Sequence, residues 1–289
     1  MSGVFSGSNP QRRRTMPMAA RLVPILLGLV AIGWIAIRGC QPGPLGRMQI
    51  VGMNAQEERA LGLQAFEETL SNARLVRGGM DAATVKQVAQ RLIAATKEEP
   101  YLAAVQQEYQ EMDWAVEVVD SQEINAFCLP GGKMVVYTGI LEIAETEAGL
   151  ATVLGHEIAH ALAHHGSERM AQSQMANIAL TSAHGSISDL DPAAREGILR
   201  TLNAGAKYGI LSYSRKHESE ADQMGLLLMA TAGYDPQESI HFWERMRQAT
   251  GNANRPPEFA STHPSHETRI SDLTEWMPEA MKLYQSQRR

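Results

Sequence analysis

The sequence predicts an α+β fold, in which a mostly helical domain carries one small β-sheet. Helical patterns cover residues 54–97, and residues 114–138 hold three short segments rich in β-branched residues. Helical patterns return from Thr146 onward. No second Pro/Gly-rich boundary and no internal repeat interrupts residues 54–289. We therefore expect one domain there.

The first segment, residues 1–21, is basic, and an uncharged apolar run occupies residues 22–37. This order is typical of a signal-anchor or a secretory signal, which we assign to residues 22–39. The run is shorter than the roughly 20 residues that span a bilayer, but Arg21 and Arg38 can extend it by snorkelling. A buried core helix is the disfavoured alternative, because Arg-rich and Gly/Pro-rich segments flank the run.

Cys40 follows the apolar run where a lipoprotein cysteine would stand. Lipid attachment there is an alternative to the anchor, although Arg38 fits such a processing site poorly. Residues 40–53 are expected to form a linker, because Pro and Gly are frequent in residues 42–46. Positive charge favours the cytoplasmic side, so we expect the body outside the cytoplasm, on the periplasmic side in a bacterium.

Charge excludes one class of function. The chain has 26 Lys+Arg and 32 Asp+Glu, a net charge of −6. Six Arg and no acidic residue lie in residues 1–47, which leaves 20 basic and 32 acidic residues, or −12, for the rest. A body this acidic is not expected to bind nucleic acid. Two Cys cannot form a disulfide framework, and no Cys-x-x-Cys is present for a thiolate zinc cluster.

The helices have recognisable starts. Asn54 and Glu57 have the form of a capping box, which predicts a helix over 54–75, and a second helix is expected over 81–97. Two later helices are predicted to begin where a capping Asp precedes a first-turn Pro, at Asp191-Pro192 and Asp235-Pro236.

The strands are expected at residues 114–120, 124–129 and 133–138. Pro130-Gly131-Gly132 turns the chain between the second and the third. We expect a small meander beside the helical stretch that follows, and we expect the third strand, at 133–138, to be an edge of the sheet.

The central chemical signal is His156-Glu157-Ile158-Ala159-His160 in the helical stretch 146–165. Residues four apart lie on one face of a helix, so both imidazoles can meet a single Zn²⁺ about 2 Å from each ring nitrogen. Glu157 is one step round the helix, where it can reach an attacking water rather than the metal.

Catalytic zinc needs a third protein ligand. The segment 214–222 offers Glu218 and Asp222, four apart on one helix face. Glu218 can ligate zinc while Asp222 accepts a hydrogen bond from a ligand His and so selects its tautomer. These residues alone leave Glu220 as a rival ligand.

Several motifs in order resemble those of peptidase family M48, the zinc endopeptidases that include HtpX, BepA and the CAAX prenyl protease. They are residues 125–132, the His156–His160 motif, residues 218–222 and residues 261–269. The resemblance implies a zincin-like domain with one Zn²⁺ per chain, and it selects Glu218 over Glu220 as the third ligand.

The resemblance leaves two roles open for His263. It can occupy the fourth zinc position in a resting form, or it can stabilise the oxyanion together with Arg269. Other histidines are expected at the surface or behind the ligands: His164, His165, His217 and His266. Cys128 is expected to be a small buried hydrophobe.

The implied reaction is peptide hydrolysis, with Glu157 as general base and then general acid. An extended peptide could add to the predicted edge strand at Met134, Val135, Val136 and Tyr137 through main-chain hydrogen bonds. The sequence therefore predicts a membrane-anchored zinc endopeptidase that acts on unfolded or extended proteins outside the cytoplasm, with protein quality control as the role that the resemblance implies.

Two other hypotheses remain. One is a chaperone-like assembly or binding factor whose zinc site is latent because His263 blocks it. The other is a structural zinc domain, which would unfold when the metal is chelated.

Overall fold

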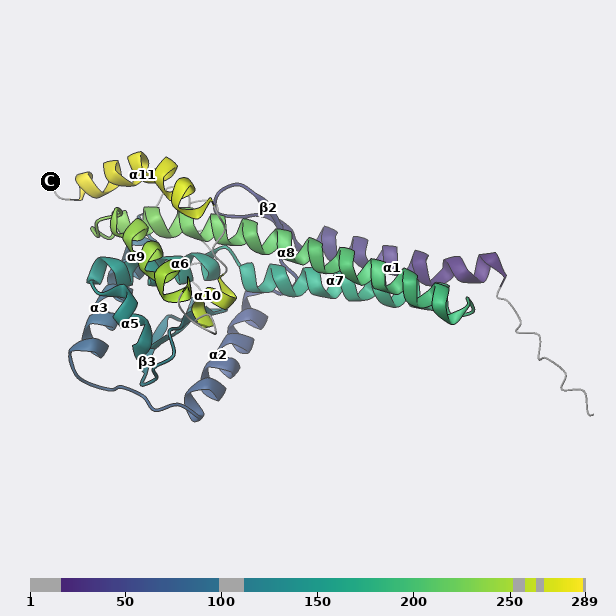
Figure 1. Cartoon of the computed structure of the whole chain (residues 1–289), viewed down its shortest axis with the longest axis horizontal. Coiled ribbons are helices and arrows are strands. Elements are labelled where there is room, and N and C mark those ends of the chain that lie inside the picture. The colour runs from purple at the N-terminus through teal and green to yellow at the C-terminus, as the bar shows by residue number, and fades with distance from the viewer. Residues whose placement is uncertain (1–16, 99–111, 252–257, 264–267, 288–289) are drawn as a thin grey trace, which may run out of the picture.

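The computed structural model describes residues 17–98, 112–251, 258–263 and 268–287. Figure 1 shows a body that contains most elements and a long extension formed by three helices. These helices are α1 (Met18–Gly39), α7 (His165–Ser186) and the first part of α8 (Pro192–Thr231). Helix α1 packs along α7, and α7 packs against α8. The second half of α8 continues into the body, so one helix joins both parts.

Helix α1 contains the apolar run and extends it to 22 residues. Within the described residues it is the one helix long and apolar enough to cross a membrane by length and composition. Most of its large apolar side chains are exposed, including Leu26 at 59 % and Leu29 at 60 %. This exposure argues against the alternative of a core helix.

The expected linker is partly ordered. Strands β1 (Cys40–Pro42) and β2 (Met48–Ile50) pair antiparallel as a hairpin directly after α1. Gly46 has a φ of 79° in the turn, which glycine adopts without steric cost. The Pro/Gly composition that predicted a linker here makes a tight turn instead.

The three-stranded sheet consists of β3 (Ala115–Val119), β4 (Ala126–Leu129) and β5 (Lys133–Tyr137). Its order is β3-β5-β4, with β3 parallel and β4 antiparallel to β5. The predicted strands are present, but the meander and the edge position of 133–138 are wrong. β5 is central because β3 pairs with its second side, and β4 has a strand on only one side within the described residues.

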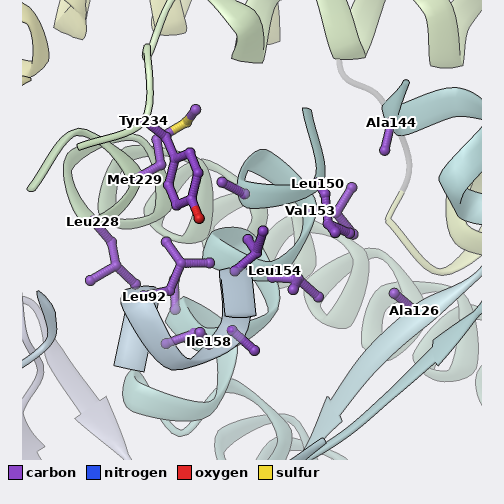
Figure 2. Close-up of a cluster of buried hydrophobic side chains, with 14 of the residues drawn as sticks. Leu92, Ala126, Ala144, Leu150, Val153, Leu154, Ile158, Leu228, Met229 and Tyr234 are labelled. Carbon is purple, nitrogen blue, oxygen red and sulfur yellow. The ribbon is translucent and has the colours of Figure 1, made fainter. Parts of the chain in front are cut away.

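Helix α6 (Glu147–Leu162) lies at the centre of the body and is buried along nearly its whole length. Figure 2 shows part of the surrounding core, where Leu92, Leu154, Ile158 and Leu228 gather. These side chains come from α3, α6 and α8. This packing holds α6 and α8 side by side, and the predicted ligands His156, His160 and Glu218 lie on these two helices.

The close approach of α6 and α8 depends on two glycines. A Cβ at Gly225 would lie 2.8 Å from the backbone N of His156, and one at Gly155 would lie 3.0 Å from Gly225 O. Larger residues would push the helices apart. Glycines at this crossing therefore set the distance between the two helices.

The remaining helices complete the body: α2 (Ala55–Ser71), α3 (Met80–Ala95), α5 (Thr138–Ala144), α9 (Glu238–Gly251), α10 (Glu258–Thr262) and α11 (Arg269–Ser286). The predicted capping box of Asn54 and Glu57 is confirmed, as is the Asp191 cap of α8. Asp235 instead caps a turn before α9, through a hydrogen bond from Gln237 N–H. The predicted α+β class is confirmed.

Candidate metal centre and active site

Four donor side chains converge between α6, α8 and the residue after α10. They are His156, His160, Glu218 and His263, and one ligand atom from each lies within 4.8 Å of the others. The Nε2 atoms of His156 and His160 are 3.0 Å apart, because residues four apart share a face of α6. The Glu218 carboxylate lies 3.4 Å from both nitrogens.

This donor set fits a metal ion. Two imidazoles and a carboxylate are the ligands that divalent metals such as zinc use in catalytic sites. Burial lowers the pKa of His156, but hydrogen bonds to Asp222 and Glu218 outweigh it and raise the pKa to about 10. Burial lowers the pKa of His160 to about 3. The carboxylates thus favour the charged form of His156, whereas burial favours the neutral form of His160.

His263 joins the donors through its Nδ1 atom, which lies 3.1 Å from Glu218 Oε2 and 3.2 Å from His156 Nε2. Phe259 holds α10 in place by donating its N–H to the carbonyl of Ile124, just before β4. Of the two roles left open for His263, this geometry favours the fourth ligand position.

Glu157 faces the same space from α6 but is not one of the four donors. Its Oε2 accepts a hydrogen bond from Cys128 N–H at 3.2 Å, and its Oε1 lies 3.4 Å from His263 Nε2. Burial raises the pKa of Glu157. A carboxylate with a raised pKa beside a metal-ligand cluster is suited to accept and return a proton.

Asp222 and Arg269 lie behind the donors. His156 Nδ1 is 2.9 Å from Asp222 Oδ1, as the sequence predicted. Arg269 donates to Asp222 at 2.6 Å and to Glu218 at 3.0 Å, and its guanidinium lies 3.8 Å from the centre of the Trp243 ring. Arg269 is 1 % exposed. The carboxylates take Nε and one terminal nitrogen of Arg269, while its Nη1 has no hydrogen-bond partner among the described residues, so the oxyanion role of Arg269 stays a prediction.

Comparison with known proteins decides the family. The model of peptidase family M48 matches residues 82–277, which is more than half of the chain. The chain belongs to peptidase family M48.

Curated M48 relatives include the mitochondrial metalloendopeptidase OMA1 of Schizosaccharomyces pombe, 41 % identical over 170 residues, which cover 59 % of this chain and 48 % of that one. The human metalloendopeptidase OMA1, mitochondrial, is 32 % identical over 246 residues, which cover 82 % of this chain and 46 % of that one. The beta-barrel assembly-enhancing protease of Escherichia coli K12 is 33 % identical over 158 residues, which cover 54 % of this chain and 32 % of that one. The chain spans about half the length of the OMA1 relatives. The names of these OMA1 relatives place them in mitochondria, which does not support a periplasmic location for this chain.

Behind His160, the M48 site has a further set of contacts that the sequence did not reveal. Glu220, the rival ligand, lies away from the donors and binds Arg47 at 2.7 Å and His165 at 3.2 Å. His165 in turn reaches His160, with 2.8 Å between their Nδ1 atoms. Arg47 stands in the β1–β2 hairpin, where no sequence pattern points to a role.

The other predicted residues are placed as follows. Met134, Val135 and Val136 are completely buried in β5, which is paired on both sides, so the prediction that 134–137 bind substrate as an edge strand is wrong. His164 is buried and bonds to Glu58 at 2.8 Å. His266 lies outside the described residues.

Proposed function

We propose that this M48 protein is a zinc-dependent endopeptidase that hydrolyses unfolded or extended proteins, with a role in protein quality control. The observation that carries the proposal is the position of Glu157. Its carboxylate lies 3.4 Å from His263 Nε2 at the rim of the donor cluster and is held by the Cys128 N–H. A base placed against a metal-ligand set is what hydrolysis of a peptide bond requires.

Zinc, when bound, supplies Lewis-acid chemistry that acidifies water and polarises a carbonyl oxygen. His156, His160 and Glu218 would hold the ion. Glu157 takes the proton from the attacking water and returns it to the leaving amine. Asp222 keeps the proton of His156 on Nδ1, which leaves Nε2 free to bind the metal.

The substrate is proposed to lie along β4 rather than β5. Cys128 N–H points to Glu157 and not to β5, so alternate main-chain groups of β4 face the site. An extended peptide can add to this side as an antiparallel strand, which brings its carbonyl groups past Glu157. Unfolded or extended chains expose such segments along their length, so they are the expected substrates.

Casein cleavage by the purified chain tests the activity. We expect cleavage that stops on chelation and returns with added Zn²⁺, and that persists in Glu142→Gln, which changes an exposed glutamate on α5. Zinc-loaded protein that leaves casein intact would contradict the proposal. A fold lost on chelation would instead support the structural zinc domain.

A second function has a specific observation in its favour. His263 Nδ1 lies among the donors, so a metal held by His156, His160 and Glu218 would have His263 at the fourth position, which a reacting group needs. The protein would then be a latent protease or a binding factor until His263 moves. His263→Ala is expected to raise casein cleavage in the latent case, and to lower it if His263 serves the reaction directly.

Membrane attachment through α1 completes the proposal, with the body on the side opposite the Arg-rich residues 1–21. Protease protection in sealed vesicles tests the side of the body. In vesicles that enclose the body, we expect added protease to digest the body only after the vesicles are opened. Lipid labelling that is lost in Cys40→Ala would show the lipoprotein alternative instead.

A further inference from the structure

We infer that His165 is a positioning residue for the metal ligand His160, and that Arg47 holds this arrangement from the hairpin that follows α1. The inference rests on the proposed function, because it assigns His160 to the metal. The contacts form one chain: His160 to His165, His165 to Glu220, and Glu220 to Arg47.

The proton positions along this chain follow from the geometry. His160 turns Nε2 toward the other donors, so a neutral His160 ring that ligates through Nε2 carries its proton on Nδ1. That N–H can donate to His165 Nδ1, 2.8 Å away. The proton of His165 then lies on Nε2, 3.2 Å from the Glu220 carboxylate, which accepts it. Each ring therefore has a single tautomer that satisfies both of its neighbours.

The same arrangement is found at the other imidazole ligand, where Asp222 accepts from His156 Nδ1. Ligand histidines in metal sites commonly donate their second N–H to a group that orients the ring and increases its basicity. His165 with Glu220 does for His160 what Asp222 does for His156. The M48 site thus has two supporting groups, one for each imidazole.

Burial and further contacts keep His165 in place. Its ring is 0 % exposed and stacks on the ring of His217, with 4.3 Å between the centroids. His217 bonds to Glu168 at 2.9 Å, and Arg47 binds both oxygens of Glu168 at 2.9 and 2.7 Å. Arg47 therefore fixes two buried carboxylates at once, Glu168 and Glu220.

The position of Arg47 in the chain connects these buried residues to the hairpin that follows α1. Arg47 immediately precedes β2, and the hairpin β1–β2 begins directly after α1. The candidate membrane helix is thus connected to the ligand His160 through a single guanidinium and two side chains. A change in the hairpin is expected to alter metal binding without a change in any ligand.

Zinc affinity and the absorption spectrum of the Co²⁺-substituted protein test the inference. His165→Phe keeps a flat ring against His217 but removes the acceptor for His160. We expect it to weaken zinc binding roughly 10- to 100-fold and to shift the Co²⁺ bands. His165→Asn restores an acceptor and should recover part of the affinity. His184→Phe, at an exposed histidine on the same helix, is the matched control and should change neither property.

Arg47→Met is the second variant, because Arg47 lies at the rim of the cluster with its side chain 25 % exposed. It should also weaken zinc binding, while the helical circular dichroism stays that of the wild type. Unchanged zinc affinity and unchanged Co²⁺ bands in folded His165→Phe or Arg47→Met would overturn the inference. Failure of the proposed function is a different result, in which the wild-type chain binds no zinc or does not cleave casein.

Discussion

The Nδ1 atom of His156 lies 2.9 Å from Oδ1 of Asp222, so the other nitrogen of His156 is the one that faces the candidate metal centre. Asp222 is itself held, because its second oxygen accepts a hydrogen bond from Arg269 at 2.6 Å. The three residues form a buried series that sets the direction of a ligand lone pair. Since the carboxylate reaches the metal only through His156, its removal is expected to lower the metal affinity through the orientation of that ring.

Asp222→Ala should weaken zinc binding roughly 10- to 100-fold, because His156 loses the acceptor that selects its tautomer. Asp222→Asn keeps an acceptor oxygen without the charge and should fall between Ala and the wild type. Competition with a zinc chelator measures both. Asp81→Ala, at an exposed position on α3, is the control and should bind zinc as the wild type does.

Arg269→Met should lower the free energy of unfolding by about 3–5 kcal/mol, because it leaves the buried carboxylates of Asp222 and Glu218 without their cation. Urea unfolding measures the loss. Arg200 forms an exposed pair with Glu196 on α8, so Arg200→Met should change stability by less than about 0.5 kcal/mol. A similar small effect from both substitutions would show that Arg269 does not support the site.

Glu168 gives a prediction on pH. Burial alone would raise the pKa of Glu168, but hydrogen bonds from His217 and Arg47 outweigh it and lower the pKa to about 2. A lowered pKa in the folded state stabilises the fold above the unfolded value of about 4.3, and this stabilisation is lost as the pH falls toward 2.

The free energy of unfolding of the wild type should therefore exceed that of Glu168→Gln most at pH 6, by on the order of 2–3 kcal/mol, and the difference should shrink between pH 5 and pH 3. Urea unfolding at these pH values measures it. Glu142→Gln serves as the exposed control, with a difference that stays nearly flat. A Glu168→Gln difference that does not depend on pH would contradict the ionised state of Glu168.

Two glycines on α8 allow the effect of close helix packing on stability to be measured apart from the effect of helix propensity. Gly225→Ala should destabilise the protein by about 1–3 kcal/mol, because the new Cβ would lie 2.8 Å from His156 N. Gly205→Ala should stabilise it by about 0.5–1 kcal/mol, since no atom lies within 4 Å of a Cβ there and alanine favours a helix. Thermal unfolding of both variants measures the two effects. A Gly225→Ala variant that is as stable as the wild type, or more stable, would show that the α6–α8 crossing is not as close as described.

Local patterns explain how much could be predicted from the sequence. His156 and His160 share a face because of helix periodicity, and Asn54 with Glu57 caps α2 through contacts three residues apart. Glu218 and Asp222 follow the same periodicity on α8. All these predictions concern residues close together in the chain, and the structure places them as expected.

The errors concern contacts between distant segments. The edge position of residues 133–138 was wrong because the pairing of β3 with β5 depends on the whole body and not on either strand's composition. Arg47 and Glu220 are 173 residues apart, and a single Arg in a Pro/Gly-rich turn carries no periodic signal. The support of His160 by His165 could be recognised only after folding brought these residues together.

The most direct measurement is the rate of casein cleavage by Glu157→Gln at the same zinc content as the wild type. Glutamine keeps the size of the side chain but cannot accept the proton, and Glu157 is not one of the four donors. We predict one zinc per chain in both proteins, with cleavage lost in the variant by at least about 100-fold. Equal cleavage by both proteins at equal zinc content would contradict the assignment of Glu157 as the base.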